Sequence, residues 1–454
     1  MTVQNSQREA RADALYERIH TLLDLNETRK AQIILQALFP VDQAEIFSDL
    51  SDDEQLRLLE GLPVNAIADI LEKVEDEEVS EIAGQLPQDQ LADILDEMEP
   101  DEAADLLGDL APDQATGLLA LMEDKEEIRT LLLHPDETAG GLMTSEYLAL
   151  GRNMWAEKAL KAIRAWAPER DLHYYFVVDT VGRVEGIVSL LQLIKAEPRA
   201  ELQQVMNREF VSAPVEADQE ACARLMSRYD LTALPVIDDQ QRLIGVITID
   251  DVVDVLEEEA TEDIQRFGGA APLEKSYLRT STWEIAKSRV GWLLLLFVTG
   301  LITTSVLESF EGTLEKVVAL SFFIPLLIGT GGNAGSQTTA TVTRALAVGD
   351  IDRKDVLRVL WHEVRVGLLM GALVAIAGFV RAWLEGGDVD LGLTIGTAVG
   401  IIVFWSTSVG SLLPIFASLV GIDPALVSGP LMSTVVDATG LFIYLTIAKW
   451  ILGL

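Results

Sequence analysis

The sequence predicts a multidomain membrane protein with an N-terminal α-helical superhelix of short repeats, a tandem pair of α/β modules, a connecting helix and an all-α transmembrane domain with five spans. Three observations lead to this prediction. A twelve-residue repeat fills residues 39–122, a second repeat relates residues 176–189 to 235–248, and apolar blocks dominate the chain from residue 288 onward. The predicted domains are 1–134, 135–256, 257–287 and 288–454.

The first repeat divides residues 39–122 into seven units of twelve residues without a gap. Proline or acidic residues cluster at the start of most units, and apolar residues follow at the eighth, ninth and twelfth positions. This pattern predicts a short helix and a turn in each unit, stacked as in solenoid proteins. The eighth residues are Ile46, Leu58, Ile70, Ile82, Ile94, Leu106 and Leu118, and the twelfth are Leu50, Leu62, Val74, Leu86, Met98, Leu110 and Met122.

The second repeat matches residues 176–189 to residues 235–248. Each copy predicts a strand, a tight polar turn, a strand and then a helix. The pair resembles tandem CBS domains, a module that commonly senses adenine nucleotides. The resemblance implies that Thr248 and Asp251 hold a ribose, whereas Ser189 and Gln192 depart from that pattern in the first copy. Whether the pair binds ATP stays open.

The formal charge of −38 resides almost entirely in the first part of the chain. Residues 1–263 contain 58 acidic and 21 basic residues, whereas residues 264–454 contain 14 and 13. Such an anionic surface repels nucleic acid and attracts cations. Excess acid also keeps proteins soluble, so the charge alone leaves both interpretations open.

An acidic segment, residues 250–263, leads from the second module toward the apolar half. At helical spacing Asp251, Asp254, Glu258 and Glu262 share one face, and Asp250 lies alongside. Like charges four residues apart destabilise an isolated helix by roughly 0.2–0.5 kcal/mol per pair. The pattern therefore favours a surface for oxygen-seeking cations over a merely solvated face.

Five apolar blocks are each long enough for the roughly 20 residues that span a bilayer. Pro325 and the run Gly329 to Asn333 predict a break or glycine-rich turn in the second block. Gly392, Gly396 and Gly400 place a small residue at every fourth position, which favours close helix packing. The blocks lie near 288–308, 317–343, 363–384, 391–421 and 424–449.

The orientation follows from the excess of Lys and Arg expected on the cytosolic side. The basic residues gather before the first block and around the connection between the second and third. We therefore expect a protein of the plasma (inner) membrane with cytosolic N-terminal domains and an external C-terminus. The start of the chain, 1–25, has no apolar core, so we expect no cleaved signal peptide. The single cysteine, Cys222, fits a reducing compartment.

Asp437 is the only acidic residue deep within an apolar block, and such a residue marks a functional site by default. Gly429, Ser433 and Asp437 recur every four residues, so they share one stripe of a helix. A twofold dimer would bring two such carboxylates to one pore, where they suit hydrated Mg²⁺ or another divalent cation. Asn333 and Gln337 can add amide oxygens. The alternative is a protonated Asp437 that donates to a neighbouring helix.

The order of these segments resembles the MgtE family of magnesium channels or transporters over nearly the whole chain. The most specific motifs are the segment from Asp136 to Thr144, the Gly331 to Gly335 run, and the segment from Asp423 to Pro430 that leads to Asp437. The family often has asparagine where this chain has Gly429, so a pore-lining amide is missing here.

The resemblance implies a homodimer in a lipid bilayer whose cytosolic domains hold a twofold pore closed when intracellular magnesium bridges their acidic surfaces. Asp437 would select the ion, with Asn333 nearby. Asp101 and Asp105 are further regulatory candidates, although their repeat unit cannot be aligned uniquely. The implied regulatory magnesium contacts are Asp218, Glu220, Asp230, Asp250, Asp251, Asp254, Glu259, Glu262, Asp263 and Asp423.

Two other functions stay open at this stage. A proton-coupled carrier of Mg²⁺, Co²⁺ or Mn²⁺ would use Asp437 as its proton-binding carboxylate. A nucleotide- or metal-regulated membrane sensor would conduct nothing. We expect no enzyme, because the four histidines lack metal-ligand spacing and no nucleophile constellation appears.

Overall fold

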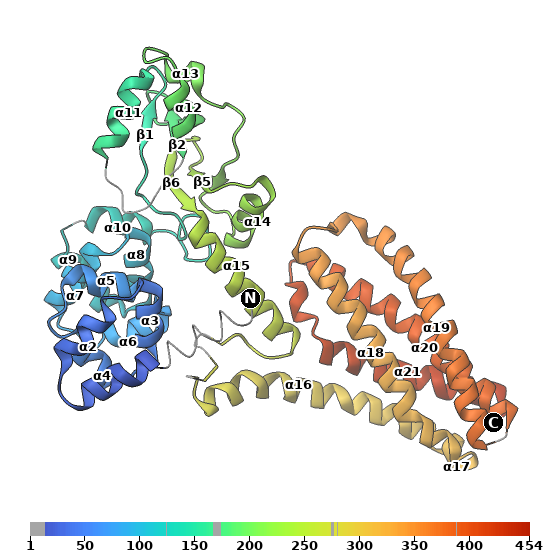
Figure 1. The fold of residues 1–454 in the computed structure, drawn as a ribbon. Coiled ribbons are helices and arrows are strands. Elements are labelled where there is room, and N and C mark those ends of the chain that lie inside the picture. The colour runs from blue at the N-terminus through green and yellow to red at the C-terminus, as the bar shows by residue number, and fades with distance from the viewer. Residues whose placement is uncertain (1–13, 124, 167–173, 274–276, 279, 387) are drawn as a thin grey trace. The chain divides into compact units, whose positions relative to one another are not determined.

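The computed structural model describes residues 14–454 except 124, 167–173, 274–276, 279 and 387 (Figure 1). The omitted residues, which fall in all four predicted domains, lie outside this description. Two compact units, Met1–Glu257 and Glu258–Leu454, make up the chain.

The first unit begins with a row of short helices, one for each predicted twelve-residue unit. A helix over residues 14–24 and α2 precede the repeats, and α10 follows them. Prolines at the first turn of α3, α8 and α9 start those helices, since proline needs no hydrogen-bond partner there. The helices are α2 (Thr28–Leu35), α3 (Pro40–Ser48), α4 (Asp52–Leu59), α5 (Val64–Leu71), α6 (Asp76–Ala83), α7 (Gln88–Glu97), α8 (Pro100–Asp109), α9 (Pro112–Leu121) and α10 (Lys125–Leu131).

Helix packing in this region follows the repeat. Most helices from α2 to α8 contact the helix two positions further on, and α8 also contacts α9. The predicted short helix in each unit is confirmed, and the apolar eighth residue of every unit is buried. These buried residues belong to one hydrophobic core that also includes residues of the second α/β module, such as Leu234 and Ile247.

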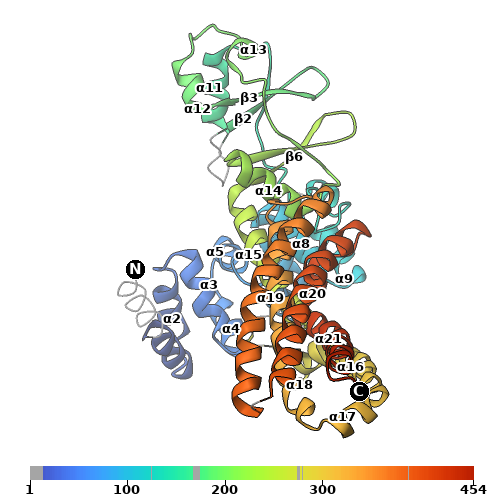
Figure 2. The same ribbon diagram turned by 90° about the vertical axis from the view of Figure 1, so that its right-hand side faces the viewer.

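The two α/β modules repeat at the spacing predicted from the sequence. Figure 2 shows β2 and β3 of the first module and β6 of the second. In each sheet the first two strands are parallel and the last two are antiparallel, and the register slips at equivalent places, Val177/Val178 and Val236/Ile237. The elements are β1 (Ala149–Gly151), α11 (Ala156–Ala165), β2 (Tyr174–Val178), β3 (Val184–Ser189), α12 (Leu190–Lys195), α13 (Leu202–Val205), β4 (Ala213–Pro214), α14 (Gln219–Tyr229), β5 (Ala233–Ile237), β6 (Leu243–Thr248) and α15 (Ile249–Phe267).

The predicted connecting helix, 257–287, is not one helix. Its first part is the end of α15, which stops at Phe267, and its last residues begin α16 at Thr282. Gly269 adopts a positive φ of 75°, a conformation that favours glycine, and Pro272 follows. These residues end the helix because neither continues the helical hydrogen-bond ladder.

The second unit contains a helix over each of the five predicted spans. Four of them, α16, α19, α20 and α21, are long and apolar enough to cross a membrane. The described part of the chain thus has several membrane-type helices, and the count of five spans stays a prediction. The elements are α16 (Thr282–Ser309), α17 (Glu311–Lys316), α18 (Ala319–Ala347), η1 (Arg353–Asp355), α19 (Val356–Gly386), α20 (Val389–Leu419), η2 (Pro424–Leu426) and α21 (Gly429–Ile451).

The predicted break in the second block is wrong, because α18 continues through Pro325 and the glycine run. The glycines allow close helix packing instead of a turn. A Cβ atom on Gly331 would lie 2.5 Å from Ile402 of α20 and 2.8 Å from Val436 of α21. A Cβ atom on Gly335 would lie 2.7 Å from Met432 of α21.

The predicted close packing at Gly392, Gly396 and Gly400 is confirmed. These residues face α19, where a Cβ atom on Gly396 would lie 2.8 Å from the carbonyl oxygen of Ala375. A Cβ atom on Gly400 would lie 3.0 Å from the carbonyl oxygen of Gly371. The two backbones therefore approach without intervening side chains, as small residues permit in membrane helices.

We predict that Gly331→Val lowers the thermal stability of the detergent-solubilised protein, since overpacking a close helix contact costs about 1–3 kcal/mol. Gly329→Val on the same helix is the matched control, because a Cβ atom there meets nothing within 4 Å. Melting curves followed by size-exclusion chromatography measure the difference. Equal melting temperatures for the two variants would show that the Gly331 contact does not limit packing.

Candidate functional site

The candidate ion site lies on α21, where the chain places a carboxylate in an apolar helix. Ser428 starts the helix, and its Oγ accepts from Leu431 N at 3.3 Å and from Trp292 Nε1 at 3.1 Å. Asp437 is half-buried, and it has no hydrogen bond or ion pair to any described residue. A protonated Asp437 donating to a neighbouring helix thus finds no acceptor among the described residues.

Ser433 and Gly429 lie where α21 meets α18. Ser336 Oγ donates to the carbonyl oxygen of Gly429 at 3.1 Å and lies 3.4 Å from Ser433 Oγ. Gly332 adds no side chain, and a Cβ atom there would lie 3.2 Å from Ser433 Oγ. This contact is a seam of small and hydroxyl-bearing residues, which leaves backbone oxygens close to the stripe that carries Asp437.

Sequence reasoning missed Ser336, although a signal was present. Gly332 and Ser336 are four residues apart on α18, as Gly429 and Ser433 are on α21. Asn333 and Gln337 both lie on the exposed side of α18. They are thus presented by a continuous helix, not by the predicted turn, and no described hydrogen bond joins Asn333 to Asp437.

Asp423 and Glu262, two predicted magnesium contacts, share one arginine. Arg266 Nη1 donates to Asp423 Oδ2 at 2.7 Å, and its Nη2 pairs with Glu262 one turn earlier on α15. Asp423 Oδ1 also accepts from Ala425 N at 2.8 Å at the start of η2. A guanidinium thus supplies the positive charge between these carboxylates. No pattern in the sequence indicated this pairing, since 157 residues separate Arg266 from Asp423.

A second acidic group surrounds the first turn of α15. Asp251 Oδ2 accepts from Thr248 Oγ1 at 2.6 Å and from Thr248 N at 3.2 Å, and Thr248 also donates to Asp250. Thr248 and Asp251, the predicted ribose-binding pair, are therefore hydrogen-bonded to each other. Partial desolvation raises the pKa of Asp254, and Lys73 opposes that shift.

The first unit brings Asp101 of α8 close to this acidic group. Its side chain is 5% exposed, and burial together with the negative charge of Asp251 raises its pKa to about 8. Glu72, which sequence reasoning missed, adds a smaller effect in the same direction. A buried acid beside another acid favours a proton or a cation, because either removes the repulsion. These carboxylates fit a hard divalent cation, which prefers oxygen ligands.

The remaining predicted contacts lie on or at the ends of three helices, α14, α8 and α15. Asp218 caps α14, and its Oδ1 accepts from Ala221 N at 3.2 Å. Glu220 pairs with Arg224 one turn later. Asp230 ends the same helix in the left-handed region, at φ 51°. Three further predicted contacts lie on helices already described: Asp105 on α8, and Glu259 and Asp263 on α15.

Family models match three parts of the chain. The model described as a divalent cation transporter, MgtE, matches residues 324–447, which contain the Asp437 stripe. The model of the MgtE intracellular N domain matches residues 38–137, and the CBS domain model matches residues 202–258. These matches cover the helical repeats, the second α/β module and most of the membrane-type helices.

Curated relatives and solved structures extend this similarity. The magnesium transporter MgtE of Thermus thermophilus is 42% identical over 329 residues, which are 72% of this chain and 73% of that protein. The magnesium transporter MgtE of Bacillus subtilis is 31% identical over 96% of this chain and 97% of its own length. A crystal structure of the cytosolic domain of the Mg²⁺ channel MgtE in complex with ATP covers 53% of this chain and 99% of its own, with 34% identity and a TM-score of 0.50. Given these extents of identity and coverage, the chain belongs to the MgtE family of magnesium transporters.

Proposed function

We propose that this protein is a magnesium channel that lets Mg²⁺ into the cell down its electrochemical gradient and closes when cytosolic Mg²⁺ rises. The observation that carries the proposal is Asp437, a half-buried carboxylate on an apolar helix without a partner among the described residues. Such a group is stable there only beside water or a cation. A channel supplies both.

The pore of this proposal lies on the twofold axis of a homodimer. Two copies of α21 would then place two Asp437 carboxylates across the axis, with Ser433 and the Gly429 backbone on the same stripe. Mg²⁺ keeps most of its water and binds through one or two carboxylates, so this pair suits a hydrated ion. Asn333, on the exposed side of α18, would add an amide oxygen.

The driving force needs no chemical coupling. An inside-negative membrane potential favours cation entry by about 2.3 kcal/mol per charge per 100 mV. The proposal places the protein in the plasma membrane, with the acidic domains in the cytosol and the C-terminus outside. That orientation exposes the sensor to the magnesium pool that the channel fills.

The gate of this proposal depends on repulsion among carboxylates. Burial and the negative charge of Asp251 raise the cost of ionising Asp101, whose pKa is raised to about 8. Magnesium ions between such groups would hold the acidic domains together and keep the pore closed, whereas low magnesium would let them separate. A ligand shifts this equilibrium only through its different affinity for the two states.

ATP binding at the module pair is part of the proposal. Its support is the similarity to the cytosolic domain of the Mg²⁺ channel MgtE that was crystallised with ATP. Thr248 and Asp251 are the residues that would hold the ribose. Because Asp251 also borders Asp101, a nucleotide there would act on the same acidic group as magnesium.

We predict that Asp437→Asn reduces Mg²⁺ influx by at least about tenfold, which corresponds to about 1.4 kcal/mol, because the amide keeps the shape and removes the charge. Influx into liposomes with an enclosed magnesium dye measures this. Asp390→Asn, an exposed acid at the start of α20, serves as control and should leave influx unchanged. Influx that requires a pH gradient would favour the proton-coupled carrier, and wild-type protein without influx at low internal Mg²⁺ would favour the sensor.

We predict that Mg²⁺ slows amide hydrogen exchange across residues 40–263 of the full-length protein in nanodiscs. Asp251→Asn should weaken this protection, because it removes one of the two repelling charges that Mg²⁺ would bridge. Asp113→Asn, an exposed acid on α9, is the control. Exchange that does not respond to Mg²⁺ in the wild type would contradict magnesium gating.

We predict that Arg266→Ala makes the protection of residues 258–267 against hydrogen exchange depend on magnesium. Removing the guanidinium leaves Glu262 and Asp423 without their shared positive charge, so exchange there should speed up in magnesium-free buffer and slow down again with Mg²⁺. Arg228→Ala on α14 is the control. Exchange that stays as slow as in the wild type without Mg²⁺ would show that Arg266 does not stabilise this contact.

A further inference from the structure

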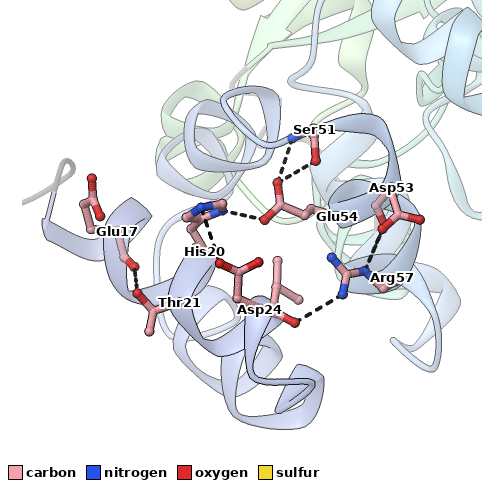
Figure 3. A network of polar contacts seen from close by, with 9 residues as sticks. Glu17, His20, Thr21, Asp24, Ser51, Asp53, Glu54 and Arg57 are labelled. Carbon is pink, nitrogen blue, oxygen red and sulfur yellow. Dashed lines mark hydrogen bonds and ion pairs between the residues drawn. The ribbon is translucent and has the colours of Figure 1, made fainter.

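A cluster of one histidine and two carboxylates lies at the start of the helical repeats (Figure 3). His20 and Asp24 lie one turn apart on the helix over residues 14–24, and Glu54 comes from α4. One ligand atom from each of the three lies within 4.8 Å of the other two. His20 Nδ1 lies 2.5 Å from Glu54 Oε1, and its Nε2 lies 3.8 Å from Asp24 Oδ2.

Neighbouring groups hold the imidazole and one carboxylate in place. Ser51 N and Ser51 Oγ donate to Glu54 Oε2 at 3.1 and 2.6 Å, which leaves Oε1 directed at His20. The His20 ring stacks on Tyr16, with centroids 5.9 Å apart and planes 4° from parallel. Such supporting contacts are a regular feature of metal sites, where they orient the ligands. Asp24 is the exposed member and can move toward an ion.

The cluster has an excess of negative charge. A single imidazolium cannot neutralise both carboxylates, and Glu17 lies close enough to add to their effect on His20. Arg57 of α4 is engaged elsewhere, with Asp53 Oδ2 and the carbonyl oxygen of Leu23, both at 3.1 Å (Figure 3). Among residues 14–454 as described, no lysine or arginine pairs with Asp24 or Glu54.

We propose that His20, Asp24 and Glu54 form a binding site for a transition-metal ion of the zinc class. Zinc accepts one imidazole and two carboxylates with bonds of roughly 2.0–2.2 Å, which places tetrahedral ligand atoms roughly 3.3–3.5 Å apart. Rotation of the three side chains would bring their ligand atoms, which now lie within 4.8 Å of one another, to this spacing. The ion takes the place of the proton between Nδ1 and Oε1, and water completes its coordination.

The histidine separates this site from the magnesium contacts. Mg²⁺ prefers oxygen ligands and gives up water reluctantly, whereas imidazole suits zinc and its neighbours in the first transition row. The acidic residues on α8 and α15 are therefore expected to hold Mg²⁺, and the His20 cluster is expected to hold zinc when Mg²⁺ is in excess. A bound ion would join the helix over residues 14–24 to α4.

The test is equilibrium dialysis of the full-length, detergent-solubilised protein against Zn²⁺ in excess Mg²⁺, with metal content measured by mass spectrometry. His20→Gln keeps a donor for Glu54 and removes the imidazole. We expect this variant to bind one zinc ion fewer per chain than the wild type. Asp24→Asn should lower the affinity of the cluster for zinc by at least about tenfold. Asp53→Asn, an exposed acid on α4 outside the cluster, is the matched control and should bind as the wild type does.

A structural readout accompanies the stoichiometry. Zinc should slow hydrogen exchange of residues 14–24 and of α4 in the wild type and in Asp53→Asn, and have no such effect in His20→Gln. Circular dichroism and a magnesium-dependent exchange pattern like that of the wild type show that His20→Gln is folded. Equal zinc content in the wild type and His20→Gln would mean that zinc binds only at other sites, and it would overturn the proposal.

Discussion

The rest of this structure depends on one constraint, the free-energy cost of placing carboxylates where water is scarce or where other carboxylates are near. In the membrane-type bundle the cost falls on Asp437, a half-buried carboxyl group on an apolar helix. A carboxylate there is stable only with water or a cation beside it. The glycines and serines of α18 and α21 let the two helices pack closely beside that stripe.

The acidic residues of the first unit and of α15 meet the same constraint in three ways. Thr248 donates to Asp250 and Asp251, so that part of their charge is satisfied by hydrogen bonds. Arg266 supplies a fixed cation to Glu262 and Asp423. At Asp101, burial and the negative charge of Asp251 together raise the pKa to about 8. A divalent cation beside these two carboxylates would lower that cost, as the proposed gate requires.

Glycine links the bundle's architecture to its chemistry. The glycine-rich run of α18 resembles the sequence of a loop. Gly331 and Gly335 are, however, four residues apart, so they lie on one side of the helix and allow close contacts with α20 and α21. Close contact brings Ser336 within hydrogen-bonding distance of the α21 backbone. A bulkier helix would move this oxygen-rich seam apart, so the same small residues set the packing and the position of the oxygens in the proposed pore.

The sequence alone determined the local features of this protein: one short helix in each twelve-residue unit, two modules at a fixed spacing, the apolar helices, and Asp437 as the one acid deep within an apolar block. These features follow from periodicity and composition over a few turns or strands. The family resemblance also marked Asp101 and Asp251 as candidates, but it marked neither their proximity nor Glu72 beside Asp101. Only the tertiary structure decided that Arg266 joins Glu262 to Asp423, that Asp101 meets Asp251, and that His20 meets Glu54. Each of these contacts joins residues far apart in the chain, and such a contact depends on how whole helices pack, which no local pattern encodes.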